Sequence, residues 1–356
     1  MATLSSQQIH IPKTNNEKED REKDYEATYQ KYNEALQTLP KERGWMSEHL
    51  VQYQGYWFSP KSALKGAFLV QHHFKAQPTD IFLSAYMKCG TTWLRTLMFA
   101  TMNRSSYDFS SQSHPLLNTG PHACFPFLDA SIYQNYPINT DLDALPSPRL
   151  FATHIPYTFL PQSVTTSSSC KIVYIWRDPK DVFISLWHFM ERIKQKGVPP
   201  LPLKEAFDMF CEGVSHYGPF WDHVLEYWKA SLESPEKFMF LRYEDLKKEP
   251  SIYLKKLAEF MGQPFSLEEE REGVVQEILK LCSFENLSNL EVNKTGVLRL
   301  SDELVVHNSE FFRKGKVGDW QNYFTDEMKE KIDLITEQKF NGSGLNFGVN
   351  PQNSNC

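Results

Sequence analysis

The sequence predicts an α/β protein with one domain, in which helices cover both faces of a central parallel sheet. Short runs of branched and aromatic residues alternate with helical patterns from about residue 80 onward, and no internal repeat or linker follows residue 35. Strands that alternate with helices favour parallel pairing. We expect a mobile polar tail over 1–35, with a helix as an option at its end, a domain over 36–348 and a second tail over 349–356.

The first predicted strand is DIFLSAY, residues 80–86, because this run is apolar and short. The segment 91–103 follows it with helical spacing, since Leu94, Leu97 and Met98 fall on one face. Another short apolar run ends just before His154. The sequence therefore predicts a strand, a loop and a helix in succession at the start of the sheet.

Two further strand–helix units follow. KIVYIWR, residues 171–177, reads as a strand, and the helix after it begins well because Asp178 can cap it and Pro179 lies in its first turn. KFMFLRYEDL, residues 237–246, gives the next strand, with a helix over 251–262 that ends at a glycine. Helical segments around 203–230 lie between these units.

The composition excludes several function classes. The net charge is −6 at pH 7, and 41% of the residues are hydrophobic and 23% charged. An acidic chain argues against broad binding to nucleic acid or anionic membranes. No secretory signal or membrane span is evident, and the six cysteines form no CxxC pair. We therefore expect reduced thiols and a cytoplasmic protein.

The loop YMKCGTTW, residues 86–93, is suited to binding an anion. Backbone N–H groups around Gly90 to Thr92 would lie at the N-terminus of a helix, where unpaired donors and the helix dipole favour a negatively charged ligand. Lys88 adds a full charge, and the threonines add hydroxyl donors. The loop lacks the Gly-Lys-Ser/Thr ending of the nucleoside-triphosphate loop. The alternative is a turn capped by threonine, with Lys88 in solvent.

Two more basic features accompany this loop. Arg177 closes a predicted strand, with Ser185 two turns into the next helix, although Arg177 could instead pair with Asp178 or Asp181. The segment FFRKGKVGDW, residues 311–320, gathers three basic residues around two glycines, which let a backbone approach a ligand closely. A solvated loop is the alternative for this segment.

These motifs together resemble one family. KCGTTW, WRDPKD, CSFENL and RKGKVGDW, in this order and spacing, closely resemble the cytosolic sulfotransferases, and LPKERGW makes the plant soluble branch the most similar. The resemblance covers about residues 40–348. It implies an enzyme that transfers a sulfuryl group from 3′-phosphoadenosine-5′-phosphosulfate (PAPS) to a hydroxyl group, releasing 3′-phosphoadenosine-5′-phosphate (PAP).

The resemblance also implies a set of binding residues. Lys88 and the segment Cys89, Gly90, Thr91 and Thr92 would hold the phosphosulfate, and Trp93 would stack on the adenine. The 3′-phosphate would be bound by Arg177, Ser185, Arg313, Lys314 and Gly315. The remaining walls of the adenine pocket would be formed by Tyr243, Cys282 and Phe284. Considered alone, the aromatic side chains could equally belong to the core.

His154, in FATHIPY, occupies the place of the family's catalytic histidine. An unperturbed imidazole is largely neutral near pH 7 and can accept a proton. The resemblance therefore implies that His154 is the base and that Lys88 stabilises charge during transfer. Because the protein supplies the positive charge and no magnesium motif is evident, we expect no metal.

The chain departs from the family at Met87, Cys89 and Cys282, where relatives usually carry proline, serine or threonine, and threonine. The loss of proline removes some preorganisation of the turn. Cys89 keeps its backbone N–H, so we interpret it as a tolerated replacement. A second hypothesis is that the helix N-terminus and Lys88 lower the pKa of its thiol and make it redox-sensitive.

The acceptor is predicted only as a small, partly apolar hydroxylated metabolite. Plant relatives act on flavonols, hydroxyjasmonates, brassinosteroids and desulfoglucosinolates, with a weak preference here for the last. Candidates for the pocket wall are Tyr157, Trp187, His188, Phe125 and Phe127. The alternatives are a nucleotide-binding regulator that has lost catalysis and a P-loop kinase. The oligomeric state stays open.

Overall fold

The computed structural model describes residues 15–109, 111, 113–133, 142–166, 169–300 and 304–345. The chain divides into two units, Met1–Thr38 and Leu39–Cys356. In the first unit, helix α1 spans Asn15–Thr38. Residues 1–14 and the predicted tail over 349–356 lie outside the described residues. The limits given above for the two tails (1–35 and 349–356) and the domain (36–348) remain predictions.

A four-stranded parallel sheet forms the centre of the second unit. Its strands are β4 (Ile81–Ser84), β5 (Leu150–Thr153), β6 (Lys171–Trp176) and β7 (Phe238–Arg242), in the order β5-β4-β6-β7. All four residues of β4 are buried, because helices cover both faces of the sheet. The predicted parallel sheet is confirmed.

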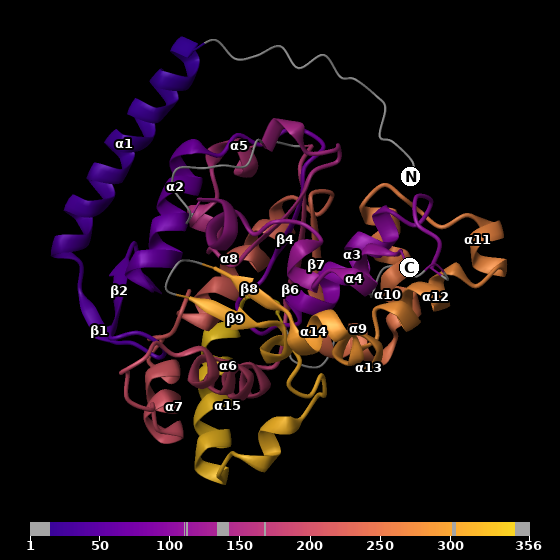
Figure 1. Cartoon of the computed structure of the whole chain (residues 1–356). Coiled ribbons are helices and arrows are strands. Elements are labelled where there is room, and N and C mark those ends of the chain that lie inside the picture. The colour runs from indigo at the N-terminus through magenta and orange to yellow at the C-terminus, as the bar shows by residue number, and fades with distance from the viewer. Residues whose placement is uncertain are drawn as a thin grey trace. The chain divides into compact units, whose positions relative to one another are not determined.

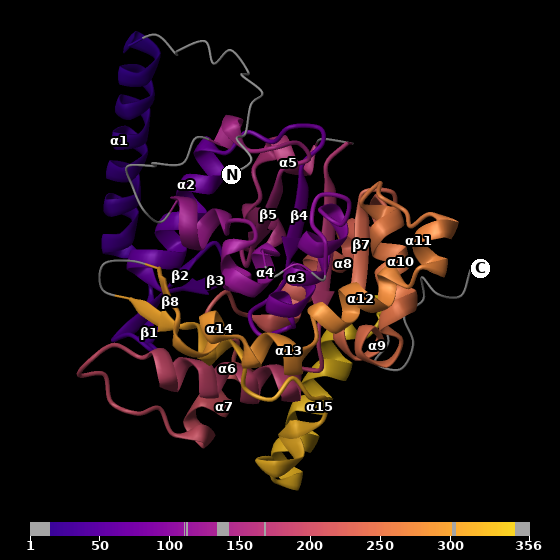
Figure 2. The same ribbon diagram turned by 45° about the vertical axis from the view of Figure 1, so that its right-hand side comes forward.

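Helices lie on both sides of this sheet (Figure 1), where the strands stand between α8 (Phe220–Glu233) and α3 (Thr91–Met102). Helix α3 contacts β4 and packs with α10 (Pro250–Phe260) and α12 (Val274–Leu281), a cluster that Figure 2 shows from another angle. Helix α8 contacts β7 and α15 (Asp326–Phe340).

Helix α6 (Pro179–Ile193) begins as the sequence predicts. The Asp178 side chain accepts a hydrogen bond from the backbone N–H of Lys180 at 2.8 Å, and Pro179 occupies the first turn. An acidic cap satisfies an otherwise unpaired donor at a helix start. The cap therefore fixes where the chain turns after Arg177.

The remaining strands form two small antiparallel sheets, β1 (Lys41–Arg43), β2 (His49–Tyr53) and β3 (Tyr56–Phe58), and β8 (Val297–Arg299) with β9 (Val305–His307). The other α-helices are α2 (Lys65–His73), α4 (Pro115–Asn118), α5 (Gln162–Thr165), α7 (Leu203–Cys211), α9 (Tyr243–Lys248), α11 (Leu267–Arg271), α13 (Phe284–Asn289) and α14 (Glu291–Thr295). Short π and 3-10 segments are η1 (Pro60–Leu64), η2 (Pro121–Ala123), η3 (Leu128–Tyr133), η4 (Leu142–Ala144), η5 (Tyr157–Phe159), η6 (Asn308–Phe311) and η7 (Asp319–Asn322). Within the described ranges, no helix combines the length and the apolar character needed to cross a membrane.

Candidate active site

The site lies at the carboxyl edge of the parallel sheet. Ser84, the last residue of β4, pairs with Thr153 of β5 and Tyr174 of β6, so the segments that follow these strands start side by side. The chain moves from β4 outward to β5 and then returns past β4 to β6. Ligands of open α/β sheets bind at such a reversal. The predicted site residues therefore converge although they are distant in sequence.

The loop between β4 and α3 has a backbone that only glycine fits well at residue 90. Gly90 has φ 105°, and a Cβ atom there would lie 2.6 Å from Cδ2 of Tyr243. Lys88 also has positive φ, 65°. The tight loop brings the N-terminus of α3 against the cavity, and the hydroxyl of Thr91 is buried there without a hydrogen-bond partner. The result is an open set of donors at a helix N-terminus.

Lys88 lies in the cavity wall with its Nζ 3.9 Å from the ring centre of Phe189. Burial, together with the positive charges of Arg313 and Arg177, lowers the pKa of Lys88 to about 7. Cations held together away from water repel one another unless an anion joins them. The electrostatics of this group therefore favour an anionic ligand.

Arg177 is buried and serves two contacts. One terminal nitrogen, Nη2, donates to the carbonyl of Lys316 at 2.7 Å and lies 3.1 Å from the carboxylate of Asp181. Its Nε is buried without a partner. The ion pair that was an alternative to anion binding is therefore present, and Arg177 still faces the cavity with an unused donor. Ser185, on α6, also lines the cavity.

Asp181 attaches the loop 313–320 to helix α6, a role that the sequence did not predict. Its buried carboxylate accepts hydrogen bonds from the backbone N–H groups of Gly318 at 2.7 Å and Trp320 at 3.1 Å. These bonds attach the loop 313–320 to helix α6. The sequence signal was its position in the first turn of α6, four residues after Arg177.

The loop 313–320 brings Arg313 and Lys314 to the cavity, where both pair with Asp319. Gly315 has φ 61°, and a Cβ atom there would lie 2.5 Å from Cδ2 of Phe284. The glycine is therefore required both for its backbone conformation and for the close approach of the ring.

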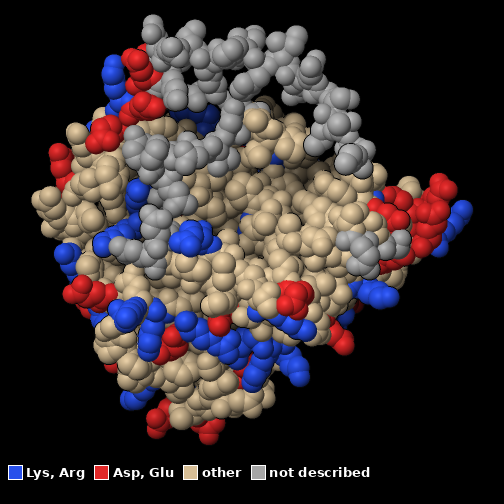
Figure 3. All heavy atoms as spheres, viewed as in Figure 1, with Lys and Arg blue, Asp and Glu red and all other residues tan. Residues whose placement is uncertain are grey.

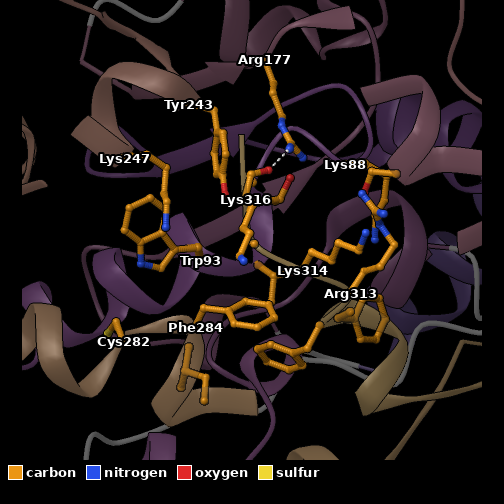
Figure 4. Close-up of a pocket in the computed structure, with 18 of the residues that line it drawn as sticks. Lys88, Trp93, Arg177, Tyr243, Lys247, Cys282, Phe284, Arg313, Lys314 and Lys316 are labelled. Carbon is orange, nitrogen blue, oxygen red and sulfur yellow. Dashed lines mark hydrogen bonds between the residues drawn. The ribbon is translucent and has the colours of Figure 1, made fainter. Parts of the chain in front are cut away.

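Aromatic side chains form the other end of the cavity (Figure 4), where Trp93, Tyr243 and Phe284 stand apart from Lys88 and Arg313. The rings of Trp93 and Tyr243 are 6.1 Å apart, edge to face. Lys247, another residue that the sequence analysis missed, holds its Nζ 5.2 Å from the Trp93 ring. It follows Tyr243 by four residues on α9, and that spacing could have indicated it.

His154 follows β5 and faces the cavity beside Phe127, with ring centres 4.9 Å apart. Its Nδ1 lies 2.7 Å from the carbonyl of Ala85. A carbonyl only accepts, so we assign the proton to Nδ1, which leaves the lone pair of Nε2 unused. Burial lowers the pKa of His154 below the ordinary value of 6.5, although Asp129 opposes this shift. The ring is therefore a neutral base near pH 7.

The cavity has a volume of about 330 Å³, within the range of small-molecule sites. Of the predicted site residues, fourteen line it: Lys88, Gly90, Thr91, Thr92, Trp93, His154, Arg177, Ser185, Tyr243, Cys282, Phe284, Arg313, Lys314 and Gly315. Further lining residues that the sequence analysis did not assign include His122, Phe189, Phe311 and Lys316.

Cys89 is not among the residues that line the cavity. Its side chain is fully buried, and burial raises the pKa of its thiol. The hypothesis of a reactive thiol with a lowered pKa is therefore wrong. The loop carries its donors toward the cavity while Cys89 points into the core.

Of the predicted acceptor wall, only Phe127 lines the cavity. Tyr157 packs against Phe238, the first residue of β7, and so lies toward the opposite end of the sheet. Phe125 lies beneath the guanidinium of Arg95. Trp187 donates to the carbonyl of Leu201, and His188 contacts Tyr323. These four residues do not line the cavity, because sequence proximity to His154 and Arg177 did not fix the direction of their side chains.

Positive charge in this acidic chain is local. Figure 3 shows a band of Lys and Arg side chains across the lower half of one face, while acidic side chains gather at its right-hand edge. In the described part of the chain, no group of three or more His, Cys, Asp or Glu side chains is arranged to hold a metal ion.

The fold and the cavity define an α/β protein with a cation-lined site at the carboxyl edge of its sheet, suited to a phosphorylated ligand. Residues 78–344 match the family model described as the sulfotransferase domain. The chain is 47% identical over 323 residues to cytosolic sulfotransferase 16 of Arabidopsis thaliana, covering 90% of this chain and 94% of that one. It is 48% identical over 296 residues to a flavonol 3-sulfotransferase of Flaveria bidentis, covering 83% and 92%.

Solved structures agree with these relatives. A crystal structure of a sulphotransferase from Arabidopsis thaliana matches with a TM-score of 0.69 and 41% identity, covering 88% of this chain and 94% of that one. A mouse sulfotransferase complexed with PAP matches with a TM-score of 0.61 and 25% identity, covering 83% and 96%. The chain belongs to the sulfotransferase family and is a sulfotransferase.

Proposed function

We propose that the protein transfers a sulfuryl group from PAPS to the hydroxyl group of a small metabolite, with His154 as the base. The observation that supports this most strongly is a single cavity that contains cations for two phosphates, aromatic walls for a base and a neutral imidazole. The chain's high identity to plant relatives that are named cytosolic sulfotransferases supports a cytoplasmic plant enzyme.

The cavity wall fits the donor. Four buried polar atoms of the lining residues have no partner within the described residues: Oγ1 of Thr91, Nδ1 of His122, Nε of Arg177 and Nε of Arg313. Unsatisfied buried donors are costly and are expected where a ligand completes them. Gly90 and Gly315 keep the backbone close to the cavity. We assign the phosphosulfate to Lys88 and the α3 N-terminus, and the 3′-phosphate to Arg177, Ser185 and the loop 313–315.

The aromatic end of the cavity fits the adenine. Trp93, Tyr243 and Phe284 offer ring faces and edges to a flat base, and base–aromatic stacking contributes about 1–3 kcal/mol for each base. Lys247 lies over Trp93 and adds a positive charge at the cavity mouth. Cys282 lies in the same wall and is fully buried.

PAPS, when bound, supplies the sulfuryl group on its 5′-phosphate. His154 accepts the hydroxyl proton of the acceptor at Nε2 while the acceptor oxygen forms a bond to sulfur. The bond between sulfur and the bridging oxygen breaks, and its electron pair stays on the 5′-phosphate. Lys88 and the N–H groups of α3 stabilise the charge that develops there. Because Lys88, Arg177 and Arg313 provide this stabilisation, we predict that EDTA leaves turnover unchanged.

The acceptor is proposed to bind beside His154, where His122, Phe127, Phe189 and Phe311 line the cavity. These side chains favour a small, partly aromatic compound with a hydroxyl group. A relative that is named for flavonol sulfation supports this class. Transfer of labelled sulfate from PAPS to a panel of hydroxylated compounds tests the proposal. No transfer to any of them, with PAP binding intact, would favour the regulator. Thermal stabilisation by ATP and magnesium but not by PAP would favour the kinase.

A further inference from the structure

The carboxylate of Asp129 lies near His154 and has no role in the chemistry described so far. Asp129 is fully buried in η3, and no ion pair involves it within the described ranges. Burying a carboxylate without a cation partner is costly. Its backbone packs closely against α2, where a Cβ atom at Gly66 would lie 2.0 Å from the Asp129 carbonyl oxygen. A buried carboxyl group in this place requires an explanation.

Both oxygens of Asp129 accept hydrogen bonds from residues that border His154. Oδ1 accepts from the hydroxyl of Thr153 at 2.7 Å, and Oδ2 accepts from the hydroxyl of Tyr217 at 2.6 Å. Because each donor has one hydroxyl proton, both protons point toward Asp129. Both oxygens of Asp129 therefore act as acceptors in these bonds.

These two donors belong to residues that adjoin His154. Thr153 precedes His154 in the chain, and its oxygen also accepts from the backbone N–H of Ile155 at 3.1 Å, so one hydroxyl bridges the residues on either side of His154. The ring centre of Tyr217 lies 5.7 Å from that of His154. Asp129 therefore orders the surroundings of the base from two directions.

Asp129 is not the hydrogen-bond partner of His154 Nδ1, because that nitrogen bonds to the carbonyl of Ala85. Its influence on the base is through the electric field. The titratable and charged groups around His154 are Lys88, Arg95, His122, Asp129, Tyr217 and His223. Two of these are cations that oppose a positive charge on His154, and Asp129 is the carboxylate in the set.

We propose that Asp129 is the positioning residue of the base, a buried counter-charge that stabilises His154 when its imidazole takes up the acceptor's proton. The inference rests on the proposed role of His154. Without Asp129, proton transfer would create a third positive charge beside Lys88 and Arg95 with no carboxylate near it. With it, the charge that His154 gains is offset at short range, with Thr153 and Tyr217 holding the carboxylate in place.

The test is a direct titration of His154 in the protein with PAP bound. Carbon-13 NMR of histidine-labelled protein would follow the imidazole, identified among the eleven histidines by its absence in His154→Gln. Asp129→Asn should lower the pKa of His154 and reduce its tendency to take up a proton about tenfold, which corresponds to one pKa unit. Asp222→Asn, which removes a charge from an exposed ion pair with Lys339, should leave that pKa unchanged.

Tyr217→Phe distinguishes an effect of the Asp129 charge on His154 from a general loosening of the site. This variant keeps the charge and removes a donor that partly neutralises it, so the pKa of His154 should rise. Loosening of the site would instead shift the pKa of His154 in the same direction in both variants. If Asp129→Asn does not fold, Tyr217→Phe decides alone, and an unchanged or lower pKa overturns the proposal. An unchanged pKa in folded, PAP-bound Asp129→Asn also overturns it.

These measurements need no turnover, so they remain informative if no acceptor is sulfated. With an active acceptor, Asp129→Asn should reduce kcat about tenfold or more and leave the KM for PAPS within about twofold. The acid limb of the kcat profile should move to lower pH, because a base with a lower pKa stays unprotonated in more acidic solution. Asp129→Glu, which keeps the charge, should restore part of the rate, and an unshifted profile contradicts the proposal.

Discussion

The pKa of Lys88 predicts that binding of PAP depends on pH. In the cavity without an anion this pKa is about 7, so about half of the side chains carry a charge at pH 7 and about one in ten at pH 8. Bound phosphate favours the charged form and raises the pKa of Lys88. Affinity should therefore fall as the pH rises through 7, by up to about 1.4 kcal/mol for each pH unit well above it.

The sign of the effect follows from proton uptake. Well below pH 7 Lys88 is already charged and binding takes up no proton at this side chain, whereas well above pH 7 binding must add one. Isothermal titration calorimetry between pH 7 and 8.5, in two buffers with different ionisation heats, would measure this uptake, which should approach one proton. Work above pH 7 also avoids the titration of the phosphate groups themselves, whose second pKa is about 6.

Lys88→Arg is the matched control, because a guanidinium stays charged over this whole range. Its affinity for PAP should lose the decline above pH 7, whatever its absolute value. A wild-type affinity that is flat from pH 7 to 8.5 without proton uptake would refute the reasoning. The same slope in Lys88→Arg would assign the proton to another group.

His154→Ala should reduce kcat by about 10² to 10⁴-fold with PAP affinity intact in calorimetry, and near-normal kcat would show that another group is the base. Gly315→Ala should weaken PAP binding at least about tenfold, because the added Cβ atom would displace Phe284. The control is Gly262→Ala, at a glycine that also has positive φ but has nothing within 4 Å of an added Cβ atom, and this variant should change only the stability of the protein. If both variants weaken PAP binding equally, backbone strain alone explains the effect. Cys89→Ser should keep near-normal turnover, and iodoacetamide should leave Cys89 unlabelled in folded protein even without PAP; rapid labelling there would contradict its burial.

Local patterns in the sequence were enough to predict the central fold. The predicted strands over 80–86, 171–177 and 237–246 contain β4, β6 and β7, and the predicted cap at Asp178 begins α6. Each of these features depends on residues within one or two turns of one another. Periodicity, capping and apolar runs report such local preferences reliably, because the atoms involved are close in the chain.

Side-chain direction across the site was less predictable. Tyr157 lies only three residues after His154, yet a short 3-10 turn carries it toward the first residue of β7, at the opposite end of the sheet. Cys89 lies between two cavity residues, and the positive φ at Lys88 and Gly90 turns its side chain into the core. Both outcomes depend on backbone geometry that composition and spacing do not encode.

The sequence by itself determined the kind of site, because Lys88, Gly90, Arg177 and the 313–315 loop combine charge with flexible backbone in an order specific to one family. Only the tertiary structure decided how that site is tuned. The low pKa of Lys88 requires Arg177 and Arg313 at short range, and the field on His154 requires Asp129, which is bound to a hydroxyl 88 residues away. Burial and Coulomb energy depend on distances in space, and those distances exist only after the chain has folded.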